Sequence, residues 1–152
     1  MPKGRELVGL PVVSREKGEE VGRVQDLLYD QQTGRLKAVV LEGGSWLRDT
    51  RVVPFNELEI RGGKTFYITS AEVISHELPA GSRRWQEIRG MPLINNDGIE
   101  LGLVEDVVFE LPSGQITALE LSTGLVNDLM EGRQEISLNG EVNWGTDTVI
   151  IG

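Results

Sequence analysis

The sequence contains no cysteine, a single histidine and few aromatic residues, which make up 5% of its 152 residues. The absence of cysteine excludes disulfides and thiolate chemistry, and it suits a reducing compartment. The scarcity of aromatic residues predicts a largely aliphatic core. No apolar run approaches the length of a membrane-spanning helix, and the N-terminus lacks the apolar segment of a signal peptide. We therefore expect a cytoplasmic protein with no membrane span.

Basic residues are scarce in the second half of the chain. Residues 82–152 carry 4 Lys or Arg and 12 Asp or Glu, whereas residues 1–81 carry 11 and 12. Because phosphate contacts need basic side chains, the second half is not expected to bind nucleic acid. Its acidic surface is typical of a soluble protein, and attraction of a basic partner is the alternative.

The residue patterns of common catalytic and cofactor sites are also missing. The sequence has no phosphate-binding Gly-Lys-Ser/Thr loop and no spacing typical of metal ligands. His76 has no second histidine to share a metal with, so we interpret it as a surface residue or as a cation at a helix end. The segment Asn95–Glu100 lacks the spaced acidic residues of a calcium loop and predicts a hairpin turn instead. We expect no catalytic residue, no cofactor and no metal.

What the sequence does contain is an internal repeat. The segment Gly22–Leu41, GRVQDLLYDQQTGRLKAVVL, recurs at an offset of 80 as Gly102–Leu121, GLVEDVVFELPSGQITALEL. Each copy has two apolar runs of β-forming residues around a polar turn that ends in Gly34 or Gly114. This pattern predicts a β-hairpin whose glycine adopts a positive φ. Apolar side chains on both faces of the first strand indicate a strand covered on both sides, as in a small barrel or sandwich.

Two carboxylates interrupt the apolar strands at equivalent positions, Asp26 and Asp106. A carboxylate kept inside an apolar strand favours a structural role, in which it accepts backbone N–H bonds at a bend. The alternative is a cleft site between the two units that uses Asp26, Asp106 or Glu120 and would bind a small ligand or catalyse a reaction.

Further short elements are expected outside the hairpins. Met1–Arg5 is expected to be a loose end. Strands are expected at Leu7–Val13, Arg51–Phe55, Lys64–Thr69 and Thr148–Ile151. A capping box, Thr69-x-x-Glu72, predicts a short helix over Thr69–Glu77. We therefore predict a first unit at residues 1–70, a linker with this helix at 71–84, and a second unit at 85–152.

Two segments supply candidate partner contacts. Trp46 and Leu47 lie in the loop after the first hairpin, where they either form an exposed apolar contact or fold over the end of a barrel. Leu125, Val126 and Leu129 would share one face of a short helix after the second hairpin. That face is either part of the core or a contact surface.

The order of these motifs resembles the PRC-barrel family. The resemblance rests on the Gly-x-Val-x-Asp start, the apolar strand, the acidic-to-glycine turn and the second apolar strand, and on Val52–Leu58 followed by Gly62-Gly63 and a closing strand. It covers the first unit throughout and the second to about Leu121, after which Gly132–Ile136 stands in place of the segment around Pro54. The resemblance implies a mainly β fold of two tandem, small, strongly bent antiparallel β-barrels joined by a short helical linker.

The resemblance also implies a type of function. Family members include the cytoplasmic domain of the photosynthetic reaction centre H subunit and the C-terminal domain of a ribosome maturation factor, and both use the barrel to dock onto proteins. A non-catalytic docking or adaptor module is therefore expected. Its partner would be a protein or protein complex, either membrane-associated or ribosomal. The two units are expected to pack through their apolar edges, and a homodimer is a further expectation.

Two other functions stay open. One is a small-ligand binder or enzyme with a site between the barrels. The other is a ribosome- or RNA-associated factor that would use the dispersed basic residues Arg48, Arg51 and Arg61 of the first unit.

Overall fold

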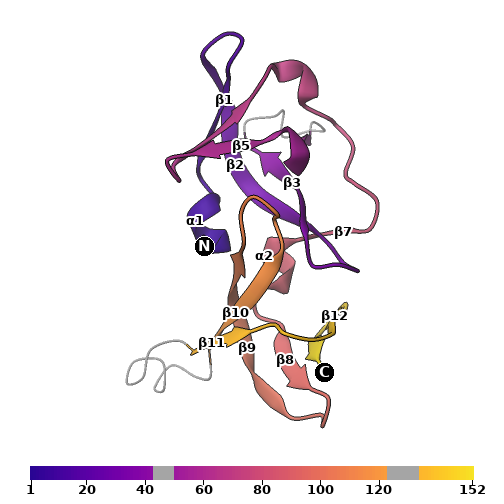
Figure 1. Ribbon diagram of the computed structural model, residues 1–152. Coiled ribbons are helices and arrows are strands. Elements are labelled where there is room, and N and C mark those ends of the chain that lie inside the picture. Colours follow the sequence, from indigo (N-terminus) through magenta and orange to yellow (C-terminus); the bar gives the residue numbers. More distant parts are fainter. Residues whose placement is uncertain (43–49, 123–133) are drawn as a thin grey trace.

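The computed structural model describes residues 1–42, 50–122 and 134–152, in which short strands dominate (Figure 1). The first half contains α1 (Gly4–Leu7), β1 (Pro11–Ser14), β2 (Glu19–Asp30), β3 (Leu36–Leu41), β4 (Arg51–Pro54), η1 (Phe55–Glu57), β5 (Glu59–Arg61), β6 (Thr65–Ile68) and η2 (Ala71–Val73), where η marks a 3-10 helix. The second half contains β7 (Ser82–Arg84), α2 (Trp85–Ile88), β8 (Pro92–Asn95), β9 (Glu100–Phe109), β10 (Ile116–Ser122), β11 (Gln134–Ser137), β12 (Val142–Trp144) and β13 (Val149–Ile151).

The strands form two curled sheets with the same strand order. The first sheet runs β4-β3-β2-β1-β6-β5, with β7 added beside β2, and the second runs β11-β10-β9-β8-β13-β12. Each sheet has one parallel pair of strands, β1 with β6 in the first sheet and β8 with β13 in the second. This pairing places a strand from late in each unit beside that unit's first strand. We call the part built on β1–β6 the first unit and the part built on β8–β13 the second unit. This confirms the expected mainly β fold, with one strongly bent sheet for each repeat.

Both predicted hairpins are confirmed, and each contains a bulge. β2 pairs with β3 and β9 with β10, and Gly34 and Gly114 adopt φ values of 68° and 79° in the turns. The pairing register shifts between Val24 and Asp26 in β2, and at the equivalent place in the second hairpin. An extra residue in one strand bends it and increases its twist. Each repeated aspartate therefore follows the bend of a long, bulged strand.

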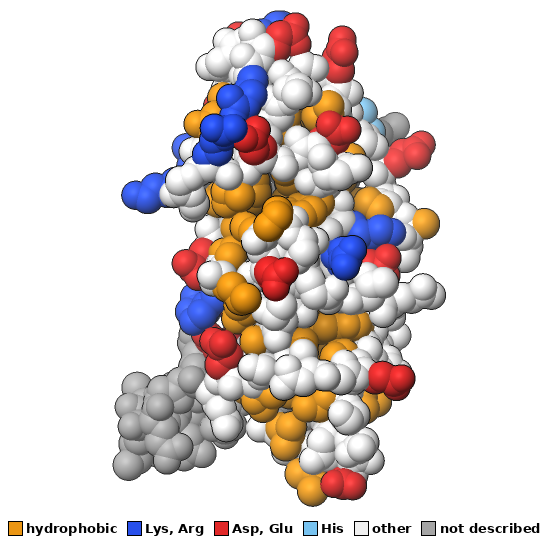
Figure 2. Space-filling model, viewed as in Figure 1, with side chains coloured by type: hydrophobic (Ala, Val, Ile, Leu, Met, Phe, Trp, Pro, Cys, Tyr) orange, Lys and Arg blue, Asp and Glu red, His pale blue; other side chains and the backbone are white. Residues whose placement is uncertain are grey.

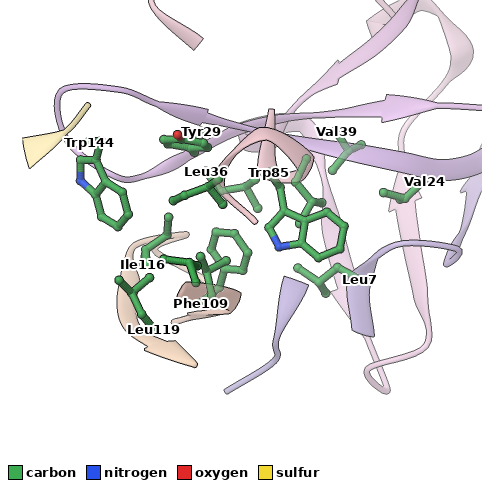
Figure 3. Close-up of a cluster of buried hydrophobic side chains, with 14 of the residues drawn as sticks. Leu7, Val24, Tyr29, Leu36, Val39, Trp85, Phe109, Ile116, Leu119 and Trp144 are labelled. Atoms are coloured by element: carbon green, nitrogen blue, oxygen red, sulfur yellow. The ribbon is translucent and has the colours of Figure 1, made fainter. Parts of the chain in front are cut away.

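One continuous hydrophobic core joins the two units (Figure 3). Tyr29 and Leu36 of the first unit lie in the same cluster as Phe109 and Ile116 of the second. A smaller cluster on the first hairpin is formed by Leu28, Ala38, Val40 and Val52. The core is less aliphatic than expected, because Tyr29, Phe66, Trp85, Phe109 and Trp144 are all buried.

The expectation of a loose N-terminus is wrong. Gly4–Leu7 forms α1, and the Pro2 carbonyl accepts a hydrogen bond of 2.9 Å from the Phe109 backbone N–H in the second unit. The strand predicted from Leu7 begins only at Pro11, because Gly9 turns the chain with a φ of 91°.

The helix predicted over Thr69–Glu77 is also wrong, since only the 3-10 turn η2 forms there. Its cap is Ser70, whose hydroxyl accepts a 3.2 Å hydrogen bond from the Glu72 backbone N–H. The helix cannot continue, because Ser75 is extended and exchanges two backbone hydrogen bonds of 2.7 Å with Val52. Pairing with β4 therefore overrides the local capping pattern.

Candidate functional site

The segment that leads into each unit adds to the sheet of the other unit. β7 and α2 come directly before the second unit, yet β7 pairs with β2 and α2 packs on β2 of the first unit. Conversely, Lys3 forms an isolated antiparallel β-bridge with Val108, and α1 packs on β9 of the second unit. Lys3 and Arg84 are equivalent at an offset of 81. The two units therefore exchange their leading segments in a nearly symmetric way.

The two hairpin turns meet across the same junction. The Leu36 backbone N–H donates to the Gly114 carbonyl at 2.8 Å, and the Ile116 backbone N–H donates to the Gly34 carbonyl at 3.0 Å. A Cβ added at Gly34 would lie 2.6 Å from the indole nitrogen of Trp144, and one at Gly114 would lie 2.9 Å from the Phe55 ring. Both positions thus require glycine for close packing as well as for the positive φ.

Asp106 is fully buried at this junction and accepts hydrogen bonds at both oxygens. Its Oδ1 accepts the Val107 backbone N–H at 2.8 Å and the Trp85 indole N–H at 2.9 Å. Its Oδ2 accepts the Arg5 backbone N–H at 3.2 Å and is 3.1 Å from the Arg5 guanidinium. Trp85 is equivalent to Gly4 at an offset of 81, and a Cβ at Gly4 would overlap the Trp85 indole. Only one of these facing positions can therefore hold a large side chain.

Glu120 forms a second, ionic contact with the N-terminal segment. Glu120 is 4% exposed, and its carboxylate lies 2.6 Å from the Lys3 ammonium and 2.8 Å from the Arg5 guanidinium. Burial alone would raise the pKa of Glu120, but the hydrogen bonds and charges of Lys3 and Arg5 outweigh it and lower the pKa to about 2. Two carboxylates and two cations thus compensate one another where the chain's N-terminus crosses to the second unit.

Asp26 has weaker partners in the equivalent place. Its Oδ1 accepts the Leu27 backbone N–H at 2.8 Å and the Gln86 backbone N–H at 3.4 Å, and its Oδ2 lies 3.4 Å from the Arg84 guanidinium. Burial raises the pKa of Asp26, and these hydrogen bonds offset only part of that effect.

These bonds give the two aspartates a common position and role. Neighbouring residues of α2 reach both, through the Gln86 backbone and the Trp85 indole, so the structure brings Asp26 and Asp106 to one junction. Both are at most 1% exposed, which leaves no approach for a substrate. Within the described ranges, no group of three or more His, Asp or Glu side chains could hold a metal ion. The carboxylates act here as acceptors that tie the leading segments in place.

A separate apolar groove of about 810 Å³ lies on the first unit. Its walls come from the start of β3, the end of β4, η1, β5 and the loop of the second hairpin. Leu36 and Phe66 are buried at its base, and Phe55, Leu58 and Ile60 are half-buried. Figure 2 shows hydrophobic side chains gathered over the middle of this face, where in Figure 1 the β9–β10 loop approaches β3.

The corresponding place on the second unit is a smaller recess, and it lies beside a hollow of about 820 Å³ that Asp30, Gln32 and Trp144 also line. A recess of about 270 Å³ is lined there by Gln115, Ile116 and Thr117, the counterparts of Arg35, Leu36 and Lys37. Trp144 and Ile60 occupy equivalent positions in the strand register. Ile60 of β5 pairs with a residue of β6 that in turn pairs with β1, and Trp144 of β12 pairs with a residue of β13 that in turn pairs with β8. The Trp144 side chain is buried and packs edge-on against Tyr29, with ring centroids 5.8 Å apart.

The predicted partner contacts Trp46, Leu47, Leu125, Val126 and Leu129 lie outside the described residues. Sequence reasoning missed the roles of Lys3, Arg5 and Trp85 at the junction, and it missed the groove. A signal for the first three was available, since Glu6-Leu7 matches Glu87-Ile88 at an offset of 81 and the repeat can be extended upstream from there.

No described helix is long and apolar enough to cross a membrane. Comparison with curated proteins finds no match to this chain. The family model of the PRC-barrel domain matches it twice, at residues 3–73 and 81–151. These two ranges start with the leading segments that the units exchange, and together they cover almost the whole chain. The chain therefore belongs to the PRC-barrel family and carries the domain in two tandem copies.

Proposed function

We propose that this protein is a non-catalytic docking module that binds a partner protein through the groove of the first unit. The observation that carries the proposal is the contrast between the two units at one position. On the first unit, Ile60 borders an apolar groove of about 810 Å³ that the described part of the chain leaves open, whereas Trp144 narrows the equivalent place on the second unit to a recess of about 270 Å³. Apolar surface that the chain does not cover itself is typical of a site where another molecule binds.

The arrangement of the carboxylates supports a role without catalysis. Asp26, Asp106 and Glu120 are buried and bonded to the leading segments of the two units. A general acid or base must reach a proton of its substrate, and these groups face other parts of the same chain. Protein docking by other members of the family supports the same conclusion.

The size of the groove also favours a second function, the binding of a small molecule. Its volume of about 810 Å³ lies within the range of roughly 300–1,000 Å³ typical of ligand sites. Native mass spectrometry of the purified protein tests this alternative. A defined excess mass that is lost in an Ile60→Trp variant would support a bound small molecule.

The docking proposal is tested by capture of the tagged protein from native lysate of its own organism, with soluble and membrane fractions kept separate. Ile60→Trp fills the groove, and Ile99→Trp is the matched control, because Ile99 is 57% exposed on the turn before β9. We expect one protein to be enriched by the wild type and by Ile99→Trp but not by Ile60→Trp, and to bind directly when purified. A partner equally enriched by Ile60→Trp, or no partner above background, would contradict the proposal.

A further inference from the structure

We propose that the groove of the first unit selects an extended peptide segment in which a large apolar side chain lies close to a carboxylate. This inference rests on the proposed function and specifies the chemistry of the partner. It follows from the shape of the groove, the charges along its rim and the differences between the two units.

The apolar part of the groove provides space for large side chains. Phe55, Leu58 and Ile60 are each half-buried, and together with buried Phe66 they surround a recess that the described residues leave open. Burial of an aliphatic or aromatic side chain against such a surface is the main source of affinity for a peptide.

The rim of the groove carries an excess of positive charge. Arg35 and Lys37 both line it, on either side of buried Leu36 in the sequence. Arg35 is exposed and forms no ion pair with any described residue. Lys37 donates to the Ala80 carbonyl at 3.0 Å and lies 3.4 Å from the Asp30 carboxylate.

The acidic residue that lines the same groove does not neutralise Arg35. The Glu59 carboxylate is bound by Arg61 and lies 3.3 Å from the Arg15 guanidinium. Among the described lining residues, the Arg35 guanidinium is therefore available for a charged partner. A guanidinium matches a carboxylate in charge and in geometry, so a carboxylate of the partner is the complementary group.

The edge of the sheet favours an extended segment. β5 is the last strand of the first sheet and pairs with β6 alone among the described strands. Glu59 and Ile60 of this strand line the groove. An extended peptide can add to an edge strand through its backbone while its side chains enter adjacent pockets.

The second unit lacks both features. Its equivalent recess has the neutral residues Gln115 and Thr117 in place of Arg35 and Lys37, and Trp144 in place of Ile60. The chain thus supplies its own matched substitutions. Arg35→Gln removes the free charge, and Ile60→Trp removes the space.

The test is selection of random octapeptides from a displayed library on the full chain, with counter-selection on Ile60→Trp. Enriched peptides are synthesised with a fluorescent label, and their affinities are measured by anisotropy. We expect a large apolar residue within about three positions of Asp, Glu or a terminal carboxylate. Replacing that carboxylate by an amide should weaken binding to the wild type roughly tenfold, and should change binding to Arg35→Gln much less. Lys17→Gln, which removes a charge from the exposed turn between β1 and β2, is the control and should bind like the wild type.

The inference is overturned if the enriched peptides lack a carboxylate, if the amide weakens binding equally in the wild type and in Arg35→Gln, or if no peptide distinguishes the wild type from Ile60→Trp. Arg35→Gln alters an exposed side chain, so we expect the variant to fold like the wild type. Lysate capture tests the proposed function separately. A partner protein that depends on the groove but not on Arg35 would leave docking intact and refute the carboxylate preference alone.

Discussion

The first and second units have the same strand order, but they carry different side chains at equivalent positions. Val40 of β3 lies in a small apolar cluster, whereas its counterpart Glu120 binds two cations from the N-terminal segment. Ile60 borders a groove of about 810 Å³, whereas Trp144 narrows the corresponding recess to about 270 Å³. The comparison teaches that one backbone can serve two purposes. In the second unit polar and aromatic side chains fix the chain's own segments, and in the first unit the described residues leave apolar surface uncovered.

The largest expected effect comes from removing the aromatic side chain that fills the second unit. Trp144→Ala should lower the free energy of unfolding by about 4 kcal/mol, because Trp144 is buried and packs on Tyr29. Ile60→Ala should cost only about 1 kcal/mol, since Ile60 is half-buried beside open space. Urea denaturation measures both values. Equal losses would remove the distinction between a filled and an open unit.

The two repeated aspartates provide the next comparison. Asp106→Ala leaves the buried Trp85 N–H and the Arg5 guanidinium without their acceptor, and should cost about 3 kcal/mol. Asp26→Ala should cost about 1 kcal/mol, because two of its three bonds are 3.4 Å long and its burial opposes ionisation. The same denaturation experiment applies. An Asp26→Ala variant as unstable as the Asp106→Ala variant would show that the two aspartates stabilise the junction equally.

Glu120 should make the second unit sensitive to acid. Its folded-state pKa of about 2 lies below the ordinary value of 4.5, so its ionisation stabilises the fold above about pH 5, and this stability is lost as the pH falls toward 2. The lowered pKa corresponds to roughly 3 kcal/mol. Glu120→Gln should therefore be less stable than the wild type at pH 7 and lose less stability on acidification.

Asp26 should have the opposite dependence on pH. Its pKa is raised by burial, so its contribution to stability is present below its unfolded pKa and is lost as the pH rises through the folded pKa. Asp26→Asn should therefore steepen the loss of stability in acid, where Glu120→Gln flattens it. Unfolding free energies measured from pH 7 to pH 3 test both. The same change of pH dependence in both variants would contradict the opposite pKa shifts of Asp26 and Glu120.

Tyr29 and Phe109 are equivalent, and only Tyr29 carries a hydroxyl. That hydroxyl is buried and has no hydrogen-bond partner among the described residues. Tyr29→Phe should therefore raise the free energy of unfolding by up to about 1 kcal/mol, because the cost of an unpaired polar group is removed. Thermal denaturation measures the change, with Tyr67→Phe as the control on a half-exposed tyrosine. A clear loss of stability would show that the hydroxyl is bonded after all.

The smallest expected effect is that of Arg35→Gln. The side chain is exposed and unpaired among the described residues, so the substitution should change the free energy of unfolding by less than about 0.5 kcal/mol. Lys3→Gln is the comparison, because Lys3 binds buried Glu120 and its loss should destabilise the protein measurably. A large effect of Arg35→Gln would mean that this residue belongs to the fold rather than to the groove.

The fold could be predicted from the sequence wherever local patterns and the repeat agreed. The hairpins, the positive φ of Gly34 and Gly114, and the bends at Asp26 and Asp106 all lie within one copied segment. The helix at Thr69–Glu77 could not be judged locally, since backbone pairing with Val52 decides its end.

The candidate site was harder to predict, because its parts are distant in sequence. Arg5 meets Asp106 and Glu120 across more than 100 residues, and the groove combines η1 with the loop at Leu111. Periodicity and turn chemistry describe segments, and they contain no information on which distant segments meet. Extending the repeat upstream to Gly4 and Trp85 would have indicated that the N-terminus belongs to the fold.

The most direct test of docking through the groove is site-specific photo-crosslinking in native lysate. A benzophenone amino acid is placed at Leu58, on the wall of the groove, and in a second variant at Lys17, on the distant turn between β1 and β2. We predict a discrete crosslinked partner protein from position 58 that is absent from position 17 and disappears when Ile60→Trp is added. The same product from both positions, or no product specific to position 58, would contradict docking at this groove.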